Sequence, residues 1–431
     1  MKATQDHEMS LKRECAIVGI LLFSTFTWTN AWYATNSLAS AEGSEPWRFA
    51  FTRFRDVGDL ALYSHSTSIA LDSNGFPHMC YVYAGYSLLK HTFYNGTSWI
   101  TENIDASGSR QISTAIDSQD HARMTYVHKY AYYNGSSWVI EVFDDTAVKS
   151  TIAIDSEDTT HIAYFNGSGL QYASFDGNAW TKETVDGVCL YSQSIPVIAV
   201  GPENHPCIAY FGGLTEMDQP LKYASFNGSA WNIQTIDVMA NSVSMALDPS
   251  GNAHVSYRNG TALNYAYYNG ELWNVQVVTT PAGGGQLTIA IDSDVRPHIV
   301  QGSRYAYYGV NAWNITTINE EDGYDPGPWG SGGWYSGTVY SPSLSVGSDD
   351  RLHVCFIGGK YTDELRYAVG TKQHLTDLSF NNASGTTLTS LPSSVRVTCP
   401  AVPGLPVRAL ECTTFANQWL DSGNWTYEEV V

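Results

Sequence analysis

The stretch that decides the fold is TIAIDSEDTTHIAY, residues 151–164, because it returns along the chain in altered copies. Close copies are SIALDSNGFPHMCY (residues 68–81), STAIDSQDHARMTY (residues 113–126) and SMALDPSGNAHVSY (residues 244–257), and weaker ones end at Tyr210, near Gln301 and at Phe356. The copies recur roughly every 38 to 55 residues, close to the length of a four-stranded propeller blade. Each alternates small and large residues with a period of two, which is typical of strands.

The seventh copy lacks its last strand. The first six continue through an aromatic stretch and a tight turn to a Trp, at Trp99, Trp138, Trp180, Trp231, Trp273 and Trp313. The seventh runs LRYAVG from Leu365 without such a Trp, whereas WRFAFTRFRDV from Trp47 stands before copy one. Such a permuted repeat lets both chain ends share one blade, which leaves no sheet edge open.

The sequence therefore predicts an all-β fold, a seven-bladed β-propeller of four-stranded blades over residues 42–370. An N-terminal strand is expected to complete the last blade. Residues 371–431 are expected to form a small or truncated C-terminal β domain, because they contain Pro-rich, strand-like segments outside the repeats.

The N-terminus has the order of a secretory signal. A Lys-Arg pair at residues 12–13 precedes an apolar run over residues 16–28 and an Ala-Ser-Ala site that ends at Ala41. The run is short for a membrane span. We expect residues 1–41 to be a signal peptide cleaved after Ala41. The mature protein is then secreted or at the cell surface, without an integral membrane span.

Charge and cysteine content exclude some partners. The chain has 22 Lys and Arg against 42 Asp and Glu, a formal charge of −20, and no basic stripe, so binding to nucleic acid or anionic lipid is disfavoured. No CxxC pair or Cys/His zinc spacing occurs. Export permits a disulfide, for which Cys399 and Cys412 are the nearest pair. Cys80 and Cys355 share one position of the repeat, so we expect both to be buried and to point the same way.

An Asp and a His recur in the repeat, as at Asp155 and His161. A metal or catalytic role is one interpretation. We favour a structural role, because a residue needed once per blade serves the blade, typically by hydrogen-bonding the backbone of a turn. A single active site would break the symmetry instead. The recurrent Trp and Tyr are interpreted as blade packing, and Asn-Gly pairs such as Asn95-Gly96 as hairpin turns.

The connections between strands two and three, and between blades, vary in length and composition. Function is therefore expected on the rim that they form. The largest departure precedes the last blade, and its candidate ligand-binding residues are Glu320, Glu321, Asp322, Asp325, Trp329, Trp334 and Tyr335. Aromatic faces stack on sugar rings and carboxylates accept hydroxyl hydrogen bonds, which favours a glycan or a surface protein as the partner.

Two other interpretations of this loop stay open. Its carboxylates are also suited to calcium, although the spacing matches no EF-hand loop. Alternatively, it is a Gly-rich loop folded over the channel mouth without a ligand. Smaller candidates on the same rim are Arg110, Lys129, Tyr191, Glu216, Asp218 and Arg258.

The phrases SFDGNAW from Ser174 and SFNGSAW from Ser225 resemble the Asp-box repeats of sialidase-like propellers. The AIDSxGxxHIAY units are similar to exported repeat proteins of bacteria and archaea. This resemblance covers about residues 47–370 and implies a propeller. An Asp-box has one residue between its acid and its Gly, whereas Asp176 and Gly177 are adjacent here. The catalytic residues of the sialidases match no positions of this chain, so sialidase activity is not implied.

The sequence favours an exported, non-enzymatic propeller that binds a carbohydrate or protein at its variable rim. No GxSxG elbow, P-loop or HExxH motif is present. One alternative is a polysaccharide-active enzyme, a glycoside hydrolase or lyase, that uses carboxylates or histidines on that rim. The other is a structural or adhesion module of a larger cell-surface protein.

Overall fold

The computed structural model describes the parts of the chain that carry the repeats, together with short C-terminal strands. These are residues 31–33, 47–54, 66–83, 88–106, 111–187, 195–213, 219–282, 285–309, 312–318, 340–358, 364–372, 380–381, 395–398, 409–415 and 427–429. Strands and turns make up this part of the chain, and no helix occurs in it.

Seven antiparallel sheets form the seven blades, and each uses its strands in the same order. The first strands are β3 (Thr67–Leu71), β7 (Ser113–Ile116), β11 (Lys149–Ile154), β15 (Val197–Val200), β19 (Val243–Leu247), β23 (Leu287–Ile291) and β27 (Tyr340–Val346). The second strands are β4 (Pro77–Tyr83), β8 (Ala122–Tyr126), β12 (Thr160–Asn166), β16 (Pro206–Phe211), β20 (Ala253–Asn259), β24 (Pro297–Gln301) and β28 (Leu352–Gly358).

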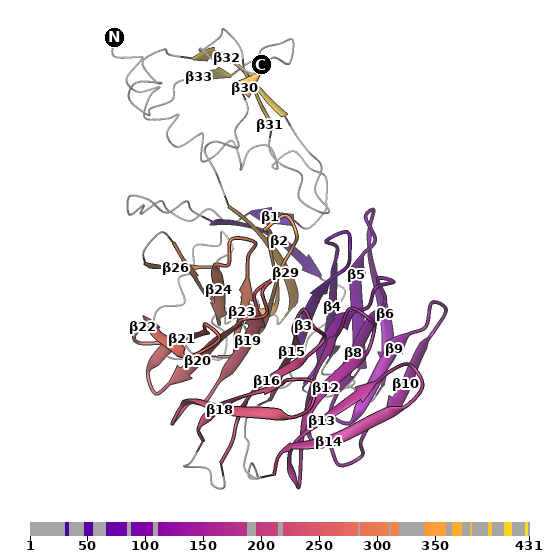
Figure 1. Cartoon of the computed structure of the whole chain (residues 1–431). Helices are drawn as coiled ribbons and strands as arrows, with labels where there is room; N and C mark the ends of the chain where they lie inside the picture. Colours follow the sequence, from indigo (N-terminus) through magenta and orange to yellow (C-terminus); the bar gives the residue numbers. More distant parts are fainter. Residues whose placement is uncertain are drawn as a thin grey trace, which may run out of the picture.

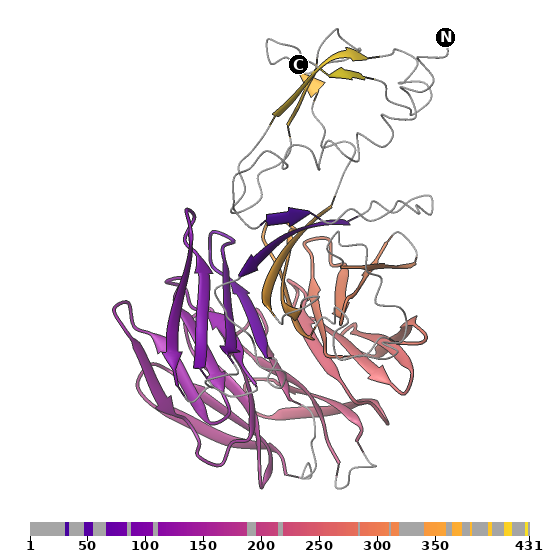
Figure 2. The same ribbon diagram turned by 180° about the vertical axis from the view of Figure 1, so that it is seen from behind.

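The third strands follow the same plan. They are β5 (Leu88–Tyr94), β9 (Lys129–Tyr133), β13 (Gly169–Phe175), β17 (Leu221–Phe226), β21 (Ala262–Tyr268), β25 (Arg304–Tyr308) and β29 (Glu364–Lys372). The fourth strands are β6 (Trp99–Asp105), β10 (Trp138–Val142), β14 (Trp180–Asp186), β18 (Trp231–Asp237), β22 (Trp273–Thr279), β26 (Trp313–Thr317) and, from the N-terminus, β2 (Trp47–Phe54). The predicted seven-bladed propeller is confirmed (Figures 1 and 2).

The ring is closed by the two ends of the repeat region. Each first strand contacts the first strand of the next blade, and β27 of blade seven contacts β3 of blade one. Strand β2 pairs with β29 along its whole length, from Trp47 opposite Lys372 to Phe54 opposite Leu365, and Figure 1 shows the two strands side by side. An open edge of blade seven is thereby covered, as the permuted repeat predicts.

The register within blade seven corrects one detail. Phe49 pairs with Gly370 as Trp138 pairs with Tyr133, so Phe49 rather than Trp47 takes the position of the repeated Trp. A Cβ on Gly370 would lie 2.6 Å from the Phe49 ring, so the close approach requires glycine there. Phe49 is 3% exposed and packs edge-on against Tyr305 of blade six, with ring centroids 5.4 Å apart.

The Ser that opens the repeated phrase joins neighbouring blades. The hydroxyl oxygen of Ser68 accepts the Thr114 backbone N–H at 3.0 Å, and that of Ser343 accepts the Ile69 N–H at 3.1 Å. Equivalent bonds link Ser113 to Ile152 and Ser244 to Ile289, both at 3.2 Å. Because the first strands lie against one another rather than pairing as a sheet, these serines satisfy backbone groups that the blade leaves unpaired.

The hairpin turns and the cysteines follow the sequence prediction. The Asn95 side chain accepts the backbone N–H groups of Thr97 and Ser98 at 3.0 and 2.8 Å, and Gly96 has φ of 86°. Cys80 and Cys355 are fully buried, and each packs on the next blade, so they point the same way. Cys399 lies outside the described residues, as does the side chain of Cys412, so their pairing stays a prediction.

A separate four-stranded sheet follows the ring. It has the order β30 (Phe380–Asn381), β31 (Val395–Thr398), β32 (Ala409–Phe415) and β33 (Tyr427–Glu429). Strands therefore occur where the sequence predicts a C-terminal β segment.

Candidate functional site

The loop singled out from the sequence leaves and rejoins the ring at the variable rim. Glu320, Glu321, Asp322, Asp325, Trp329, Trp334 and Tyr335 lie outside the described residues. Their flanks are described. Ile318 is 4% exposed and donates its N–H to Ser303, in the connection between strands two and three of blade six. On the other side Tyr340 pairs with Ile357, near the end of the second strand of blade seven.

The recurrent Asp and His are occupied with building the blade. Asp155 Oδ1 accepts the backbone N–H groups of Glu157 and Thr159 at 2.9 and 2.8 Å, which holds the turn. Asp155 Oδ2 lies 3.1 Å from His161 Nε2, and His161 Nδ1 lies 2.5 Å from the Tyr172 hydroxyl. The structural role predicted for this Asp and His is confirmed, and a Tyr on the third strand joins them.

The charges of this triad follow from its burial. Burial opposes ionisation of Asp155, but the hydrogen bonds from His161 and from the turn outweigh it, so the pKa of Asp155 is lowered. Burial also lowers the pKa of His161. A carboxylate beside a neutral imidazole therefore prevails at neutral pH. The same three residue types lie together at Asp248, His254 and Tyr265 and at Asp292, His298 and Tyr305. There the His Nε2 lies 3.6 and 3.3 Å from the Asp Oδ2, and the His Nδ1 lies 2.7 Å from the Tyr hydroxyl.

Four blades depart from the triad. In blade four Gly201 and Cys207 replace the Asp and the His, and the turn is held by the backbone bond from the Gly201 N–H to His205 at 3.0 Å. In blade one His91 replaces the Tyr, its Nε2 lying 3.0 Å from His78 Nδ1. In blade two Arg123 replaces the His and donates to Asp117 Oδ2 at 3.0 and 3.1 Å. In blade seven Gly347 replaces the Asp, and Asp349 accepts the Arg351 N–H at 3.1 Å instead. Each substitution keeps the turn or the buried polar group hydrogen-bonded.

A belt of tryptophans joins the outer strands and was missed in the sequence. The Trp231 indole N–H donates to Glu183 of the preceding blade at 2.9 Å, and the Trp273 indole N–H donates to Gln234 at 2.9 Å. Each acceptor stands three residues after the Trp of its own blade. The spacing Trp-x-x-Glu/Gln was therefore the available signal. The acceptors in the described part of the ring are Glu102, Glu141, Glu183, Gln234 and Gln276.

Carboxylates at the ends of the fourth strands line the variable rim. Asp105 accepts the Tyr126 hydroxyl and the Lys129 ammonium of the next blade, both at 2.8 Å. The register of strands three and four shifts beside this residue, since Leu89 pairs with Asp105 but Lys90 pairs with Asn103. Asp186 accepts Tyr210 at 2.9 Å and Lys222 at 2.8 Å in the same way, and Asp144 and Asp237 accept Tyr164 and Tyr257. These carboxylates hold blades together as well as facing the rim.

Two of the smaller candidates from the sequence, Lys129 and Arg258, lie in the described part of the chain. Lys129 belongs to the Asp105 cluster. The Arg258 side chain donates to Asn241 at 3.1 Å on the connection from blade four to blade five. Arg110, Tyr191, Glu216 and Asp218 lie outside the described residues.

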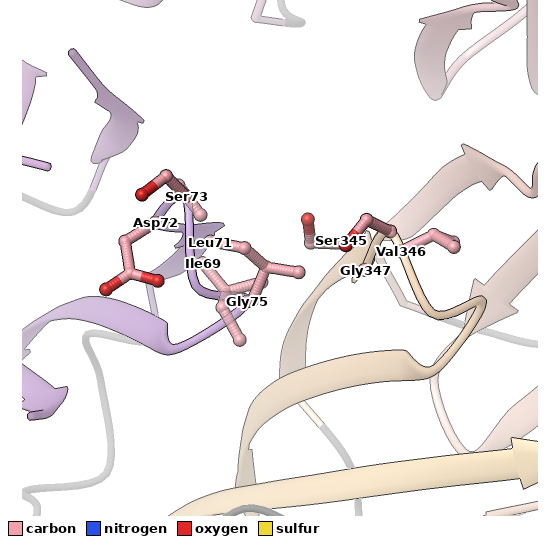
Figure 3. A pocket seen from close by; sticks show the side chains of 10 residues that line it. Ile69, Leu71, Asp72, Ser73, Gly75, Ser345, Val346 and Gly347 are labelled. Atoms are coloured by element: carbon pink, nitrogen blue, oxygen red, sulfur yellow. The ribbon is translucent and has the colours of Figure 1, made fainter. Parts of the chain in front are cut away.

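A cavity of about 430 Å³ opens on the opposite, uniform rim, between blades seven and one. Figure 3 shows Ile69, Leu71 and the turn from Asp72 to Gly75 on one side, and Ser345, Val346 and Gly347 on the other. Ser348 completes the wall next to Gly347. The sequence gave no indication of this cavity, because it lies between turns of two blades that are far apart along the chain.

Turns of neighbouring blades are joined on this rim by a hydrogen-bonded contact, which we call a clasp, between a Ser of one turn and an acid or amide of the next. The cavity lies at a seam that lacks this contact. At the same level of other blades, Ser73 donates its N–H and hydroxyl to Asp120 at 2.7 and 2.8 Å, and Ser118 donates likewise to Asp158 at 2.7 and 2.6 Å. Further clasps join Ser156 to Asn204 and Ser293 to Asp350. At the closing seam Ser348 takes the donor position, but Gly75 stands where the acceptor belongs.

The described residues contain no group of three or more His, Cys, Asp or Glu side chains placed to hold a metal ion. In that same part of the chain, no helix is long and apolar enough to cross a membrane.

No family model matches this chain, and no curated protein matches it. Solved structures are similar in fold at low identity. A variant of the Aleuria aurantia lectin in complex with Fucα1-6GlcNAc is 10% identical with a TM-score of 0.43, over 86% of this chain and 97% of that chain. A Penicillium chrysogenum α-L-arabinanase complexed with arabinobiose is 11% identical with a TM-score of 0.42, over 73% and 94%. The extracellular domain of BT4673 from B. thetaiotaomicron is 11% identical with a TM-score of 0.47, over 88% and 47%. At these values the similarity identifies no ligand or activity.

Proposed function

We propose that the protein is an exported, non-enzymatic propeller that binds a carbohydrate or protein ligand at its variable rim, through the loop between Glu320 and Tyr340. The observation that carries this proposal is where the chain leaves and rejoins the ring. Ile318 and Ser341, 4% and 6% exposed, anchor the two flanks at blades six and seven. A long aromatic and acidic connection is thereby tethered to the rim where the blades differ most.

The repeated chemistry supports a ligand-binding rather than catalytic role. Asp, His and Tyr of blade three are hydrogen-bonded to one another, and the His and Tyr of blades five and six are hydrogen-bonded as a pair. The Trp indoles are hydrogen-bonded to neighbouring blades. Asp176 caps its turn by accepting the Asn178 and Ala179 N–H groups at 2.8 Å, as Asn227 does in blade four. The proposed relation to sialidase-like propellers therefore concerns the scaffold.

Export is part of the proposal and is compatible with the ring. Strand β1 (Ala31–Tyr33) lies within the predicted signal peptide and pairs with β2 as a fifth strand of blade seven. Cleavage after Ala41 would remove β1 and leave β2, so blade seven would keep four strands like the others. Mass spectrometry of the protein purified from the medium tests this, and an intact N-terminus would count against cleavage.

Binding is tested on a glycan array and on cell-wall fractions, with the W329A/W334A double variant beside the unaltered protein. We expect saturable binding that the double variant loses. Leu272→Ala is the matched control, because Leu272 is 68% exposed on the opposite rim and its removal should leave binding unchanged. Calcium and a chelator are added in parallel arms, since Glu320, Glu321, Asp322 and Asp325 are suited to that ion. Absence of binding to every glycan and fraction would overturn the proposal.

A further inference from the structure

The clasps of the uniform rim form a series in which one member is half complete. In three of the four complete clasps a Ser backbone N–H and hydroxyl hold both oxygens of one carboxylate, as Ser293 holds Asp350 at 2.8 and 2.6 Å. In the fourth, Ser156 holds the amide oxygen of Asn204 with both groups. Asp350 and its counterparts Asp120 and Asp158 all have positive φ, between 58° and 63°. The backbone N–H and the hydroxyl of one Ser thus bind one carboxylate, which the chain itself normally supplies.

The seams without a clasp are of two kinds. Between blades four and five, Pro202 removes both donor groups and Gly251 removes the acceptor. Between blades five and six, Pro249 and Val295 do the same. At the closing seam only the acceptor is absent, because Ser348 keeps its N–H and hydroxyl. Neither group of Ser348 has a hydrogen-bond partner within the described part of the chain.

Space for an acceptor is present at Gly75 but not at Gly251. A Cβ on Gly75 would meet no atom within 4 Å, whereas one on Gly251 would lie 2.9 Å from Pro202 Cδ. The cavity of about 430 Å³ lies at Gly75 and Ser348 and is open to solvent. Its volume falls in the range of small-molecule sites, ~300–1,000 Å³.

We propose that Ser348 and this cavity form a binding site for the carboxylate of a small polar ligand, of the hexuronate or hydroxy-acid class. The carboxylate takes the place that Asp120 and Asp158 occupy in blades two and three. The Ser348 N–H and hydroxyl donate one hydrogen bond to each of its oxygens. The hydroxyl of Ser345 on the wall suits a further polar group of such a ligand. Two charge-assisted hydrogen bonds at an open site support millimolar affinity.

The neighbouring charges permit a carboxylate there. Asp72 lines the cavity and is a like charge, but its Oδ1 accepts the N–H groups of Asn74 and Phe76 at 2.9 and 2.7 Å. Asp349, whose Oδ1 would lie 2.7 Å from a Cβ on Gly347, is a second like charge and is paired with Arg351. In blade two the turn acid Asp117 and the clasp acid Asp120 already stand three residues apart, so the ring accommodates this pairing. Arg351, 3.2 Å from Asp349, contributes a cation to the same turn of blade seven.

The proposal is tested by saturation-transfer NMR with D-glucuronate and lactate, and with D-glucose and methyl glucuronate as uncharged counterparts. We expect saturable signals from the two acids and none from the counterparts. Ser348→Pro copies the natural Pro202 and Pro249, so the turn is retained while both donors are lost. Gly75→Asp supplies the carboxylate from the chain. Both variants should weaken binding of the acids at least tenfold, with circular dichroism confirming that they are folded.

This site is independent of the variable rim, and the experiment separates the two. The W329A/W334A variant should bind glucuronate as well as the unaltered protein does. If that variant loses glucuronate binding while Ser348→Pro keeps it, the carboxylate is bound elsewhere and the inference is overturned. The same conclusion follows if the acids bind no better than glucose. Binding of one acid alone supports the site and distinguishes a uronate from a hydroxy acid.

Discussion

At the scale of single residues, burial in the blades lowers the pKa of five histidines. Burial lowers the pKa of His78 to about 3, with His91 opposing its charge further, and burial lowers the pKa of His353 to about 4. Burial also lowers the pKa values of His91, His161 and His254. A neutral imidazole is what the triad needs, because it can accept a hydrogen bond on one nitrogen and donate on the other.

This predicts a loss of stability in weak acid. In the unfolded chain a His takes up a proton near pH 6.5, whereas in the folded ring it resists protonation down to the lowered pKa. The unfolded state therefore binds more protons, and the free energy of unfolding should fall as pH drops from about 6.5 toward 4. Above about pH 7 the free energy of unfolding should not change with pH. Urea unfolding followed by tryptophan fluorescence between pH 8 and 4 measures it.

A variant identifies the source of this pH dependence. His161→Gln keeps a polar side chain but removes one titrating group, so the slope below pH 6.5 should become shallower by up to one proton. The acids Asp155, Asp248 and Asp292 have lowered pKa values, so their contribution is lost only below about pH 4. If the urea concentration at the midpoint of unfolding is the same from pH 8 to pH 5, the histidines are not held neutral by folding.

The role of a residue could be predicted from the sequence where that residue recurs in the repeat. One Asp and one His in most copies pointed to the turn, and the contacts of Asp155 bear this out. The third partner, Tyr172, was not singled out although it is the single Tyr of β13, because the sequence does not show which residue of the third strand lies beside His161. Only the register, with Tyr172 opposite Ala163, selects it.

At the scale of turns and strands, the clasp predicts opposite effects of one substitution at two glycines. Gly75→Asp should let Ser348 donate to a carboxylate, adding roughly 0.5–1.5 kcal/mol to the free energy of unfolding. Gly251→Asp should lower it by about 1–3 kcal/mol, because its Cβ would lie 2.9 Å from Pro202 Cδ. Both glycines have positive φ, 76° and 83°, so the backbone cost is matched. Urea unfolding at pH 7.5 compares them, and equal effects would contradict the clasp.

The tryptophan belt gives a second prediction at this scale. Glu183→Gln should change the free energy of unfolding by less than about 0.5 kcal/mol, because Gln already accepts the indole N–H at Gln234 and Gln276. Glu183→Leu should lower it by about 1 kcal/mol, since the Trp231 N–H then loses its acceptor. Denaturant unfolding of the unaltered protein and the two variants measures these differences. If the Gln variant is as destabilised as the Leu variant, the charge rather than the hydrogen bond matters.

Turns were predictable from sequence, and contacts between blades were not. An Asn-Gly pair defines its own hairpin, because the chemistry involves residues two or three apart, as at Asn95. The clasp from Ser73 to Asp120 joins residues 47 apart, and their meeting depends on how neighbouring blades are placed around the ring. The seam cavity belongs to this second kind, since Gly75 is conspicuous only when Asp120 and Asp158 are known to be clasp residues.

At the scale of the whole molecule, the sequence predicted the ring and its closure, but aligned the closing strand two residues off. Trp47 and Phe49 stand two positions apart in the sequence, so the strand period alone cannot decide which of them matches the repeated Trp. The pairing with Gly370 chooses Phe49. The loop between Glu320 and Tyr340 could not be predicted in the same way, because it is not part of the repeat. Its flanks are fixed by Ile318 and Tyr340, and its ligand stays a proposal because no repeat constrains residues that occur once.

Closure by β2 (Trp47–Phe54) leads to the last prediction. A chain that begins at residue 42 keeps this strand and should unfold at the same urea concentration as the full chain. A chain that begins at residue 66 leaves the β29 edge unpaired, so it should be less stable and self-associate, as open strand edges do. Size-exclusion chromatography and urea unfolding measure both effects. The substitution Phe49→Ala separates packing from edge pairing, because it keeps the strand but removes a side chain 3% exposed against Tyr305. It should cost about 3–5 kcal/mol without self-association. A monomeric chain from residue 66 with an unchanged midpoint would show that the ring is held closed by the contact of β27 with β3 instead.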